Sequence, residues 1–235
     1  MFNRKFKIGT RTSPLALKQV DEAAACIREF YLGFNYEAVG IETRGDKDKI
    51  TSISDMEGSD FFTREIDEAL LVGEIDFAVH SAKDLPDILP KGLVIAAMTR
   101  PLDKHDALVS KNNLKIDELP YGARIGASSK RRKEQLKRFR KDLQVADIRG
   151  NVNERLQISE AGELDGIIVA ACALLRLGLG HKITEMIPFE ILKPHPLQGS
   201  LALVVRSDKA DLIEALSKIG PSSESLICEN RYERD

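Results

Sequence analysis

The chain has 235 residues, of which 43% are hydrophobic and 31% are charged. This composition predicts a soluble globular protein with one large domain or two modest ones. The net charge of −2 argues against general polyanion binding, so any role for charge must come from local clusters. The three cysteines are widely spaced and form no Cys-x-x-Cys pair, which argues against a structural zinc site and favours a reducing compartment. No export signal and no apolar run of membrane-spanning length is found.

Strands alternate with helices over the first hundred residues. Ser13 is suited to be a hydroxyl N-cap, because Pro14 follows it at the first helical position. The segment 44–60 is long, polar and weakly patterned, so we expect either a functional lid or a mobile surface loop. The periodicity predicts strands at 5–9, 36–43, 75–79 and 93–98, and helices at 15–31 and 61–73.

The same alternation continues after residue 100. Polar, proline-bearing segments near 100 and near 195 are predicted to be crossovers that join two domains. The periodicity predicts strands at 124–127, 143–147, 166–170 and 201–205, and helices at 129–139, 151–161, 171–177 and 208–219. This order indicates an α/β fold with mostly parallel sheets and ligands at the carboxyl ends of strands.

Polar residues gather where predicted strands end or helices begin, which is where open α/β sheets bind ligands. The groups are Arg11 with Ser13; Ser81, Lys83 and Asp84; Ser128, Ser129, Arg131 and Arg132; and Arg149, Gly150, Asn151 and Arg155, to which Arg176 and Gln198 are added. A cleft lined in this way suits a ligand with many carboxylates or phosphates. Asp84 among these cations would stay ionised. It could stabilise a developing cation or protonate a leaving group.

Each group also has a structural alternative. Ser81 and Asp84 have the spacing of a capping box variant. The segment 149–151 could be an ordinary glycine turn with a surface arginine. These alternatives stay open when each motif is taken alone, but the recurrence of cations at several strand ends favours a binding site.

The segment 130–141 is strongly basic. It could be a solvated helix face, an anion site or a nucleic-acid surface. Arg131 and Arg132 would oppose the helix dipole in the first turn, which makes sense if a carboxylate or phosphate lies beside them. Phe139 is the only aromatic side chain of this segment on which a base could stack, and the net charge of the chain is negative. Nucleic-acid binding is therefore not predicted.

Seven stretches resemble, in order and spacing, the hydroxymethylbilane synthase family, also called porphobilinogen deaminase. The central stretch is His-Ser-Ala-Lys-Asp-Leu-Pro at 80–86, and the others are 8–17, 42–46, 126–132, 148–156, 176–179 and 196–199. Each stretch alone is weak, but together they are highly specific and cover nearly the whole chain.

The resemblance implies an α/β fold of two periplasmic-binding-protein-like domains of type II, with a central cleft and two hinge crossovers. Domain 1 is expected at 1–99 plus 200–220, and domain 2 at 100–199. The family has a third, α+β domain, which we expect to be missing or vestigial here. Residues 221–235 resemble a remnant of the first helix of that domain.

The resemblance also implies a reaction. The family joins four porphobilinogens head to tail, each losing ammonia, and grows the product on a dipyrromethane cofactor bound through a cysteine, without a metal. Asp84 matches the catalytic aspartate. Cofactor binding is implied for Ser13, Ser81, Lys83, Asp84, Ser128, Ser129, Arg131, Arg132, Gly150 and Asn151. Substrate binding is implied for Arg11, Arg149, Arg155, Arg176 and Gln198.

Some residues depart from the family pattern. The family attaches its cofactor through a Gly-Gly-Cys loop, and neither Cys26, Cys172 nor Cys228 lies in such a motif. Residues 58–60 read Gly-Ser-Asp where the family has a Gly-Lys-Gly-type stretch, and Ser200 stands where a small alanine is common. The main expectation is a cytoplasmic, monomeric synthase that takes porphobilinogen and binds neither membrane nor nucleic acid. The alternative is a catalytically silent homologue that binds porphobilinogen or polypyrrole carboxylates without turnover.

Overall fold

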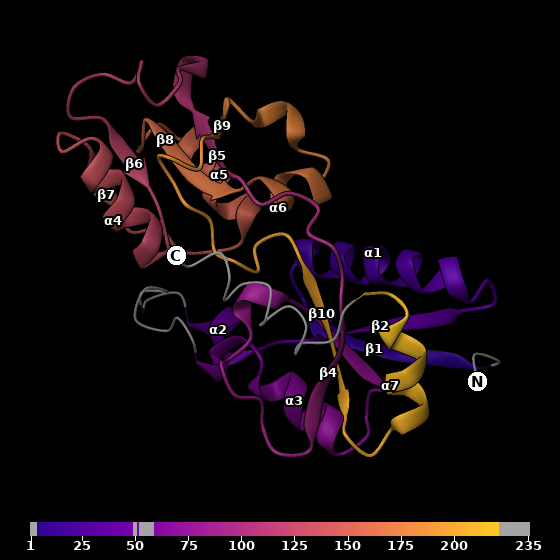
Figure 1. Ribbon diagram of the computed structural model, residues 1–235. Coiled ribbons are helices and arrows are strands. Elements are labelled where there is room, and N and C mark those ends of the chain that lie inside the picture. Colours follow the sequence, from indigo (N-terminus) through magenta and orange to yellow (C-terminus); the bar gives the residue numbers. More distant parts are fainter. Residues whose placement is uncertain (1–3, 49–50, 52–58, 221–235) are drawn as a thin grey trace. The chain divides into compact units, whose positions relative to one another are not determined.

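The computed structural model describes residues 4–48, 51 and 59–220 and divides into two compact units (Figure 1). The described part of unit 1 comprises residues 4–47, 59–102 and 199–220. The described part of unit 2 comprises residues 48, 51 and 103–198. The expected remnant of a third domain at 221–235 lies outside the described residues.

Unit 1 is built on a five-stranded sheet in the order β2-β1-β3-β10-β4. Strand β1 pairs in parallel with β2 and β3, whereas β10 is antiparallel to both β3 and β4. The strands are β1 (Lys5–Arg11), β2 (Asn35–Ile41), β3 (Phe77–Ser81), β4 (Leu93–Met98) and β10 (Leu201–Arg206). The helices are α1 (Pro14–Phe30), the short α2 (Arg44–Lys47), α3 (Arg64–Leu71) and α7 (Ala210–Ser217), with 3-10 turns at η2 (Asp60–Phe62) and η3 (Ala82–Asp84).

Helices cover both faces of the unit 1 sheet. One face packs against α1 and α7, whose buried residues include Ile27 and Leu216, around Phe6 and Phe77. The other face packs against α3, through buried side chains such as Ile66. Strand β3 shows why both faces are filled: Phe77 and Val79 belong to the first cluster and Ala78 to the second, as the alternation of side chains in a strand requires.

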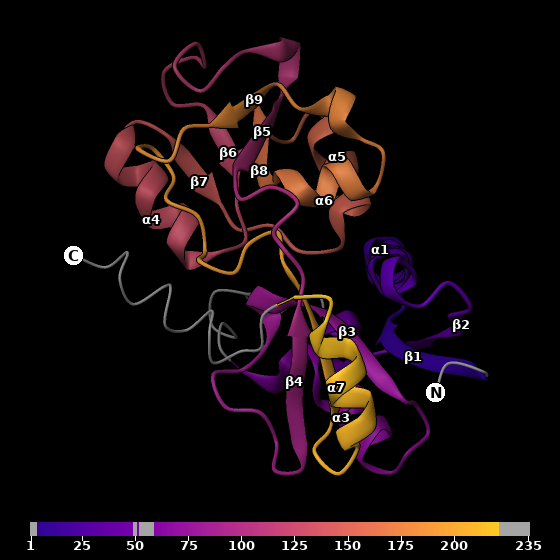
Figure 2. The same cartoon turned by 45° about the vertical axis from the view of Figure 1, so that its right-hand side comes forward.

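Unit 2 repeats the plan with a sheet in the order β7-β6-β8-β5-β9. Strand β6 pairs in parallel with β7 and β8, and β5 is antiparallel to β8 and β9. Figure 2 shows α4 on one face of this sheet and α5 with α6 on the other. The elements are β5 (Asp106–Ser110), β6 (Arg124–Gly126), α4 (Lys130–Phe139), β7 (Gln144–Ala146), α5 (Val152–Glu160), β8 (Gly166–Ala170), α6 (Ala171–Arg176) and β9 (Glu185–Ile187), with 3-10 turns η4 (Lys111–Asn113) and η5 (Gly180–Lys182).

The sheets are mixed, so the expectation of mostly parallel sheets is wrong in part. In each unit one strand is inserted antiparallel, namely β10 in unit 1 and β5 in unit 2. Strand β10 enters unit 1 only after the chain has passed through unit 2. The sequence pattern missed β5 and β9 because each is short and lies beside a polar, proline-bearing segment.

The predicted helix start at Ser13 is confirmed. Ser13 Oγ accepts a hydrogen bond from the Ala16 amide at 3.2 Å, and Pro14 is the first residue of α1. The segment 44–60 is not wholly a loop, because its first residues form α2. Residues 49–50 and 52–58, including Gly58 of the predicted lid change, lie outside the described residues.

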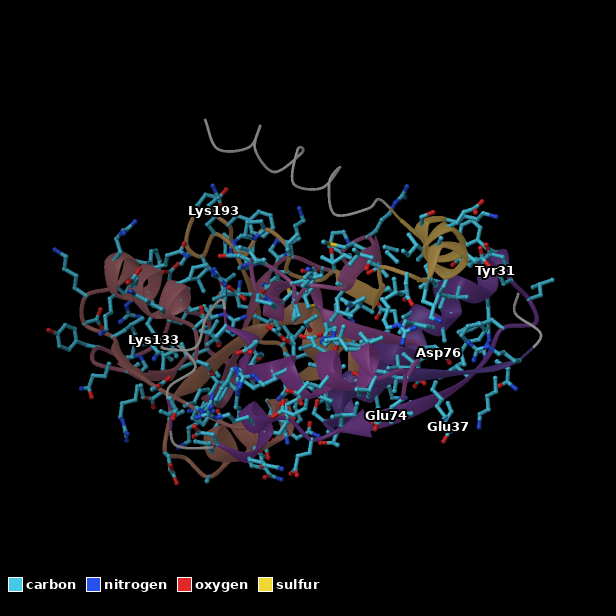
Figure 3. The ribbon with its side chains drawn as sticks, turned by 90° about the horizontal axis from the view of Figure 1, so that it is seen from below. Tyr31, Glu37, Glu74, Asp76, Lys133 and Lys193 are labelled. Carbon is cyan, nitrogen blue, oxygen red and sulfur yellow. The ribbon has the colours of Figure 1, made fainter. Side chains whose placement is uncertain are left out.

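Acidic side chains gather at the end of the unit 1 sheet where the parallel strands begin. Figure 3 shows Glu37, Glu74 and Asp76 there. Arg4 pairs with Asp76 (Nη1–Oδ2 3.0 Å), and the Lys7 amide donates to the same carboxylate at 2.8 Å. The carboxyl ends of β1 and β3, which hold the predicted site residues, lie at the opposite end. Within the described ranges no helix is long and apolar enough to cross a lipid bilayer.

One buried charge in unit 1 has no compensation. Asp67 in α3 is 2% exposed, and neither of its carboxylate oxygens has a hydrogen-bond partner. Burial raises the pKa of Asp67 to about 6 from 3.8, and the nearby Thr63 hydroxyl offsets only part of this rise without making a well-formed hydrogen bond. The fold therefore favours the protonated carboxyl.

This raised pKa predicts a pH-dependent cost. The unfolded carboxyl ionises near pH 4 and the folded one near pH 6, so the chain loses stability as the pH rises through this window. We expect Asp67→Asn to be more stable than the parent by about 1–2 kcal/mol at pH 7.5, with the difference vanishing near pH 4. Urea unfolding at both pH values would test this. The exposed neighbour Glu68→Gln is the control, and an equal gain in both variants would contradict the prediction.

Candidate functional site

A pocket in unit 1 lies at the carboxyl ends of β1 and β3. Of the residues proposed from the sequence, Arg11, Ser13, Ser81 and Asp84 all line it. The remaining lining residues are Thr10, Leu15, Ala16, Gln19, Phe62, Thr63, Val79 and His80. The parallel pairing of β1 with β3 brings these segments together, because parallel strands end at the same edge of a sheet.

Arg11 is held in place by a carboxylate. Its guanidinium forms an ion pair with Asp46, with Nε 3.1 Å from Oδ1, and it stacks over the Phe62 ring at 4.4 Å. Burial would raise the pKa of Asp46. The hydrogen bonds and charge of Arg11, together with hydrogen bonds from the Thr43 hydroxyl and amide, hold this pKa below its ordinary value. Sequence reasoning did not assign Asp46 a role, although it lies in one of the family-like stretches.

Ser81 is not part of a capping box. It precedes η3 without making a side-chain cap, and its Oγ instead accepts a hydrogen bond from Gln19 Nε2 at 2.7 Å. Gln19 is 4% exposed and lies on α1, so it orients the Ser81 hydroxyl from the neighbouring helix. The capping interpretation of Ser81 and Asp84 is therefore wrong. Lys83 lies in η3 beside them but is not among the pocket-lining residues.

His80 is a member of this pocket that sequence reasoning did not single out. The side chain is 5% exposed, and its Nε2 atom is buried without a hydrogen-bond partner. Burial, reinforced by the charge of Arg11, lowers the pKa of His80 to about 4. The imidazole is therefore neutral at physiological pH.

Arg131 and Arg132 of unit 2 have the neighbouring carboxylate that their place in the first turn of α4 called for, and it belongs to the chain itself. Asp106, fully buried at the start of β5, accepts from Arg131 Nη2 at 2.7 Å and from Arg132 Nε at 3.0 Å. Burial would raise the pKa of Asp106, but the two guanidiniums hold it well below its ordinary value. Arg131 keeps a side-chain exposure of 24%, against 6% for Arg132. Arg131 is thus the more accessible of the two.

Gln198 and Ser128 are buried in the same unit and make internal hydrogen bonds. Gln198 Nε2 donates to the Lys104 carbonyl at 2.8 Å and to Asp106 Oδ1 at 2.9 Å. Ser128 Oγ donates to the Ile148 carbonyl at 2.8 Å. Gln198 therefore helps to hold Asp106, the partner of the arginine pair, and Ser128 fixes the backbone at Ile148.

The segment Arg149-Gly150-Asn151 combines a turn and a helix start. Gly150 has φ +99°, a left-handed conformation that favours glycine, and Asn151 forms a reciprocal capping box with Glu154. Arg149 and Gly150 line a second, shallow pocket within unit 2. Arg149 Nε is buried there without a hydrogen-bond partner, although its Nη2 donates to the Asp48 carbonyl.

Three further proposed residues belong to the same unit. Arg155 donates from Nε to the Gly150 carbonyl at 2.8 Å. Ser129 is the N-cap residue of α4, without a side-chain cap bond, and Arg176 ends α6. Neither of the two described cysteines, Cys26 and Cys172, lines either pocket.

The Asp106 cluster predicts a large effect of neutralising its carboxylate. Asp106→Asn leaves two arginines, one of them buried, without a counter-charge, and we expect it to lower the free energy of unfolding by roughly 3–5 kcal/mol at pH 7. Because the folded pKa lies below the ordinary 3.8, the contribution is complete above about pH 4 and is lost as the pH falls further.

Urea unfolding of the parent and Asp106→Asn between pH 7 and pH 3 would check this, because the difference should shrink below pH 4. Asp142→Asn is the comparison variant, since Asp142 pairs with the single arginine Arg140 and both side chains keep partial exposure, 16% and 18%. The prediction fails if the control loses as much stability as Asp106→Asn.

Solved structures with a similar fold include two from bacteria. A Bacillus subtilis lipoprotein described as methionine-binding aligns with a TM-score of 0.54 and 14% identity over 92% of this chain and 89% of its own. The periplasmic VFT2 domain of Bordetella pertussis BvgS aligns with a TM-score of 0.50 and 18% identity over 91% of this chain and 86% of its own. These similarities confirm the predicted fold of two α/β domains of the type II periplasmic-binding-protein kind.

Sequence comparisons show the family. The family model described as "Porphobilinogen deaminase, dipyromethane cofactor binding domain" matches residues 6–214. The porphobilinogen deaminase of Natranaerobius thermophilus is 44% identical over 93% of this chain and 70% of its own length. That of Pelotomaculum thermopropionicum is 42% identical over 92% of this chain and 69% of its own. The chain therefore belongs to the porphobilinogen deaminase family of transferases.

Proposed function

We propose that this chain is a hydroxymethylbilane synthase, which joins four porphobilinogens head to tail with loss of ammonia to form a linear tetrapyrrole. The observation that carries the proposal is the unit 1 pocket, in which Asp84 lies with Arg11, Ser13 and Ser81. A carboxylate beside an arginine and two hydroxyls suits a substrate that carries carboxylates and develops a cation. The reaction that we propose is the one implied by membership of the porphobilinogen deaminase family.

Asp84 is proposed as the catalytic residue. When the aminomethyl C–N bond of porphobilinogen breaks, the electron pair leaves with nitrogen as ammonia, and the pyrrole nitrogen donates its lone pair into the ring. The result is an azafulvenium-like cation. The Asp84 carboxylate accepts a hydrogen bond from the pyrrole N–H and stabilises this cation, until a ring carbon of another pyrrole attacks and loses its proton.

The residues also fit a dipyrromethane group, whose rings carry acetate and propionate carboxylates. Arg149 Nε is a buried donor without a partner, and such an atom suits a carboxylate ligand. The proposed holding residues are Ser13, Ser81, Lys83, Asp84, Ser128, Ser129, Arg131, Arg132, Gly150 and Asn151, and the proposed substrate residues are Arg11, Arg149, Arg155, Arg176 and Gln198. Dipyrromethane, when bound, supplies the chain end on which the product grows. The buried Ser128, Arg132 and Gln198 would act by positioning their neighbours.

The remaining parts of the proposal concern the protein as a whole. We propose two domains at 1–99 plus 200–220 and at 100–199. We further propose a cytoplasmic monomer that takes porphobilinogen as its partner and binds neither membrane nor nucleic acid. The net charge of −2 and the absence of a membrane-spanning helix from the described ranges support the latter.

Asp84→Asn tests the catalytic role. The amide keeps the size of the side chain but loses the negative charge that stabilises the cation, so we expect hydroxymethylbilane formation to fall at least about 100-fold with the thermal midpoint unchanged. Asp87→Asn, three residues on and exposed, is the control and should keep full activity. Activity of Asp84→Asn within a few-fold of the parent would exclude Asp84 as the charge that matters.

Turnover and binding measurements on the parent protein distinguish the two functions considered for it. Production of hydroxymethylbilane from porphobilinogen supports the synthase. Binding of porphobilinogen without product would instead identify the silent homologue.

Mass spectrometry of the intact protein tests cofactor attachment. Cys172 is 3% exposed and burial raises the pKa of the Cys26 thiol, so neither is suited to form a thioether to the cofactor. If the parent carries a dipyrromethane mass increment and colours with Ehrlich's reagent, we expect Cys26→Ser and Cys172→Ser to keep both. Loss of the increment in either variant would show that it is the anchor.

A further inference from the structure

A glutamine stands in the otherwise apolar face that α1 turns to the sheet of unit 1. The buried residues of this helix are Ala16, Gln19, Val20, Ala23, Ala24 and Ile27. Gln19 is 4% exposed. A buried amide costs free energy unless it is hydrogen-bonded, so a glutamine at this position needs a partner. That partner is Ser81, whose Oγ accepts from Gln19 Nε2 at 2.7 Å.

The alternation of side chains along β3 brings Ser81 to this helix. Phe77 and Val79 pack in the cluster that includes the buried face of α1, and Ser81 continues the same row. Ser81 is partly exposed, and Ser81 and Gln19 both line the pocket that contains Asp84. The hydrogen bond therefore joins a buried amide to a hydroxyl at the surface of the pocket.

This hydrogen bond fixes the polarity of the Ser81 hydroxyl. A serine hydroxyl has one proton to donate and two lone pairs that accept. Because Gln19 is the donor, it occupies a lone pair of Ser81 Oγ and leaves the hydroxyl proton directed away from α1. Among the described residues no acceptor takes this proton, Asp84 included. Ser81 therefore offers an O–H donor to a ligand in the pocket.

Two further residues of the pocket are donors as well. Ser13 Oγ accepts from the Ala16 amide at 3.2 Å, so its proton too is left without an acceptor in the described part of the chain. Arg11 uses Nε and Nη2 for Asp46, and its Nη1 has no partner within the described ranges. Donors of this kind match a carboxylate, whose oxygens only accept. They disfavour a carboxamide, whose NH₂ group would face another donor.

We propose that Gln19 is a positioning residue that makes this pocket selective for carboxylates, because it holds the Ser81 hydroxyl as a donor. The inference rests on the proposed function, since it takes the acetate or propionate of a pyrrole ring as the carboxylate. Without the Gln19 amide, the Ser81 hydroxyl is free to turn and to accept a hydrogen bond from a ligand. The preference for a carboxylate over a carboxamide then shrinks.

Two unreactive ligands test this selectivity by calorimetry. Both have a methyl group in place of the aminomethyl group of porphobilinogen, so neither can lose ammonia. One keeps the acetate and propionate, and the other carries both as carboxamides. Gln19→Met removes the amide from a side chain of similar length, and we expect it to weaken binding of the carboxylate ligand about fivefold and of the carboxamide ligand less than about twofold. Ser81→Ala should reduce the preference for the carboxylate ligand at least as much.

A double-mutant cycle separates positioning from packing. Ser81→Ala removes the hydroxyl on which Gln19 acts, so in that background Gln19→Met should change carboxylate binding less than about twofold. A role of Gln19 in packing α1 alone would weaken binding equally in both backgrounds. Gln144→Met is the control, because Gln144 is exposed on β7 and should leave both affinities unchanged. Thermal unfolding of each variant verifies folding.

An equal effect of Gln19→Met with and without the Ser81 hydroxyl would overturn the inference. Equal weakening of both ligands, no weakening, or no binding of the carboxylate ligand to the parent would overturn it as well. Any of these results alongside hydroxymethylbilane production by the parent would leave the synthase proposal intact. Conversely, carboxylate-selective coupling between Gln19 and Ser81 without product would support the inference and defeat the synthase proposal.

Discussion

The parallel pairing of β1 with β3 is the constraint on which the unit 1 pocket depends. Ile8 lies opposite Phe77 and Gly9 opposite Ala78, so the two strands end at the same edge of the sheet. A hydrogen bond from Thr10 Oγ1 to the Val79 carbonyl at 3.1 Å continues this contact to the edge. A slip of one residue would turn His80 to the other face of the sheet. The pocket lining therefore follows from the register.

A second principle is that aspartates of the chain itself position three of the proposed site arginines. Asp46 orients Arg11 in unit 1, and Asp106 orients Arg131 and Arg132 in unit 2. A carboxylate in a protein interior is stable only with such partners, and each guanidinium in return keeps a defined direction. Arginines that are already ordered before a ligand arrives lose less conformational entropy when they bind a carboxylate. His80 shows the opposite case, since its buried Nε2 has no hydrogen-bond partner.

Much of this could be predicted from local pattern. The helix start at Ser13 follows from a hydroxyl before a proline, and the placement of Asp84 at the edge of the sheet follows from a buried apolar run before it. The antiparallel direction of β10 could not be predicted, because strand direction depends on pairing with residues far away in sequence. The pairing of Asp106 with the arginines was missed for the same reason, since at least 25 residues separate the partners. A lone aspartate before a short apolar run carries no local signal of its partner.

The sequence by itself determined the family, the alternation of strands and helices, and the chemical character of the strand ends, because these depend on residue type and spacing along the chain. Only the tertiary structure decided which of those residues share a wall. It placed Arg11, Ser13, Ser81 and Asp84 around one pocket, gave Arg132 and Gln198 buried internal partners, and added His80 and Thr63. The physical reason is that burial and hydrogen-bond satisfaction are properties of the packed molecule, set by contacts between segments that the order of residues does not reveal.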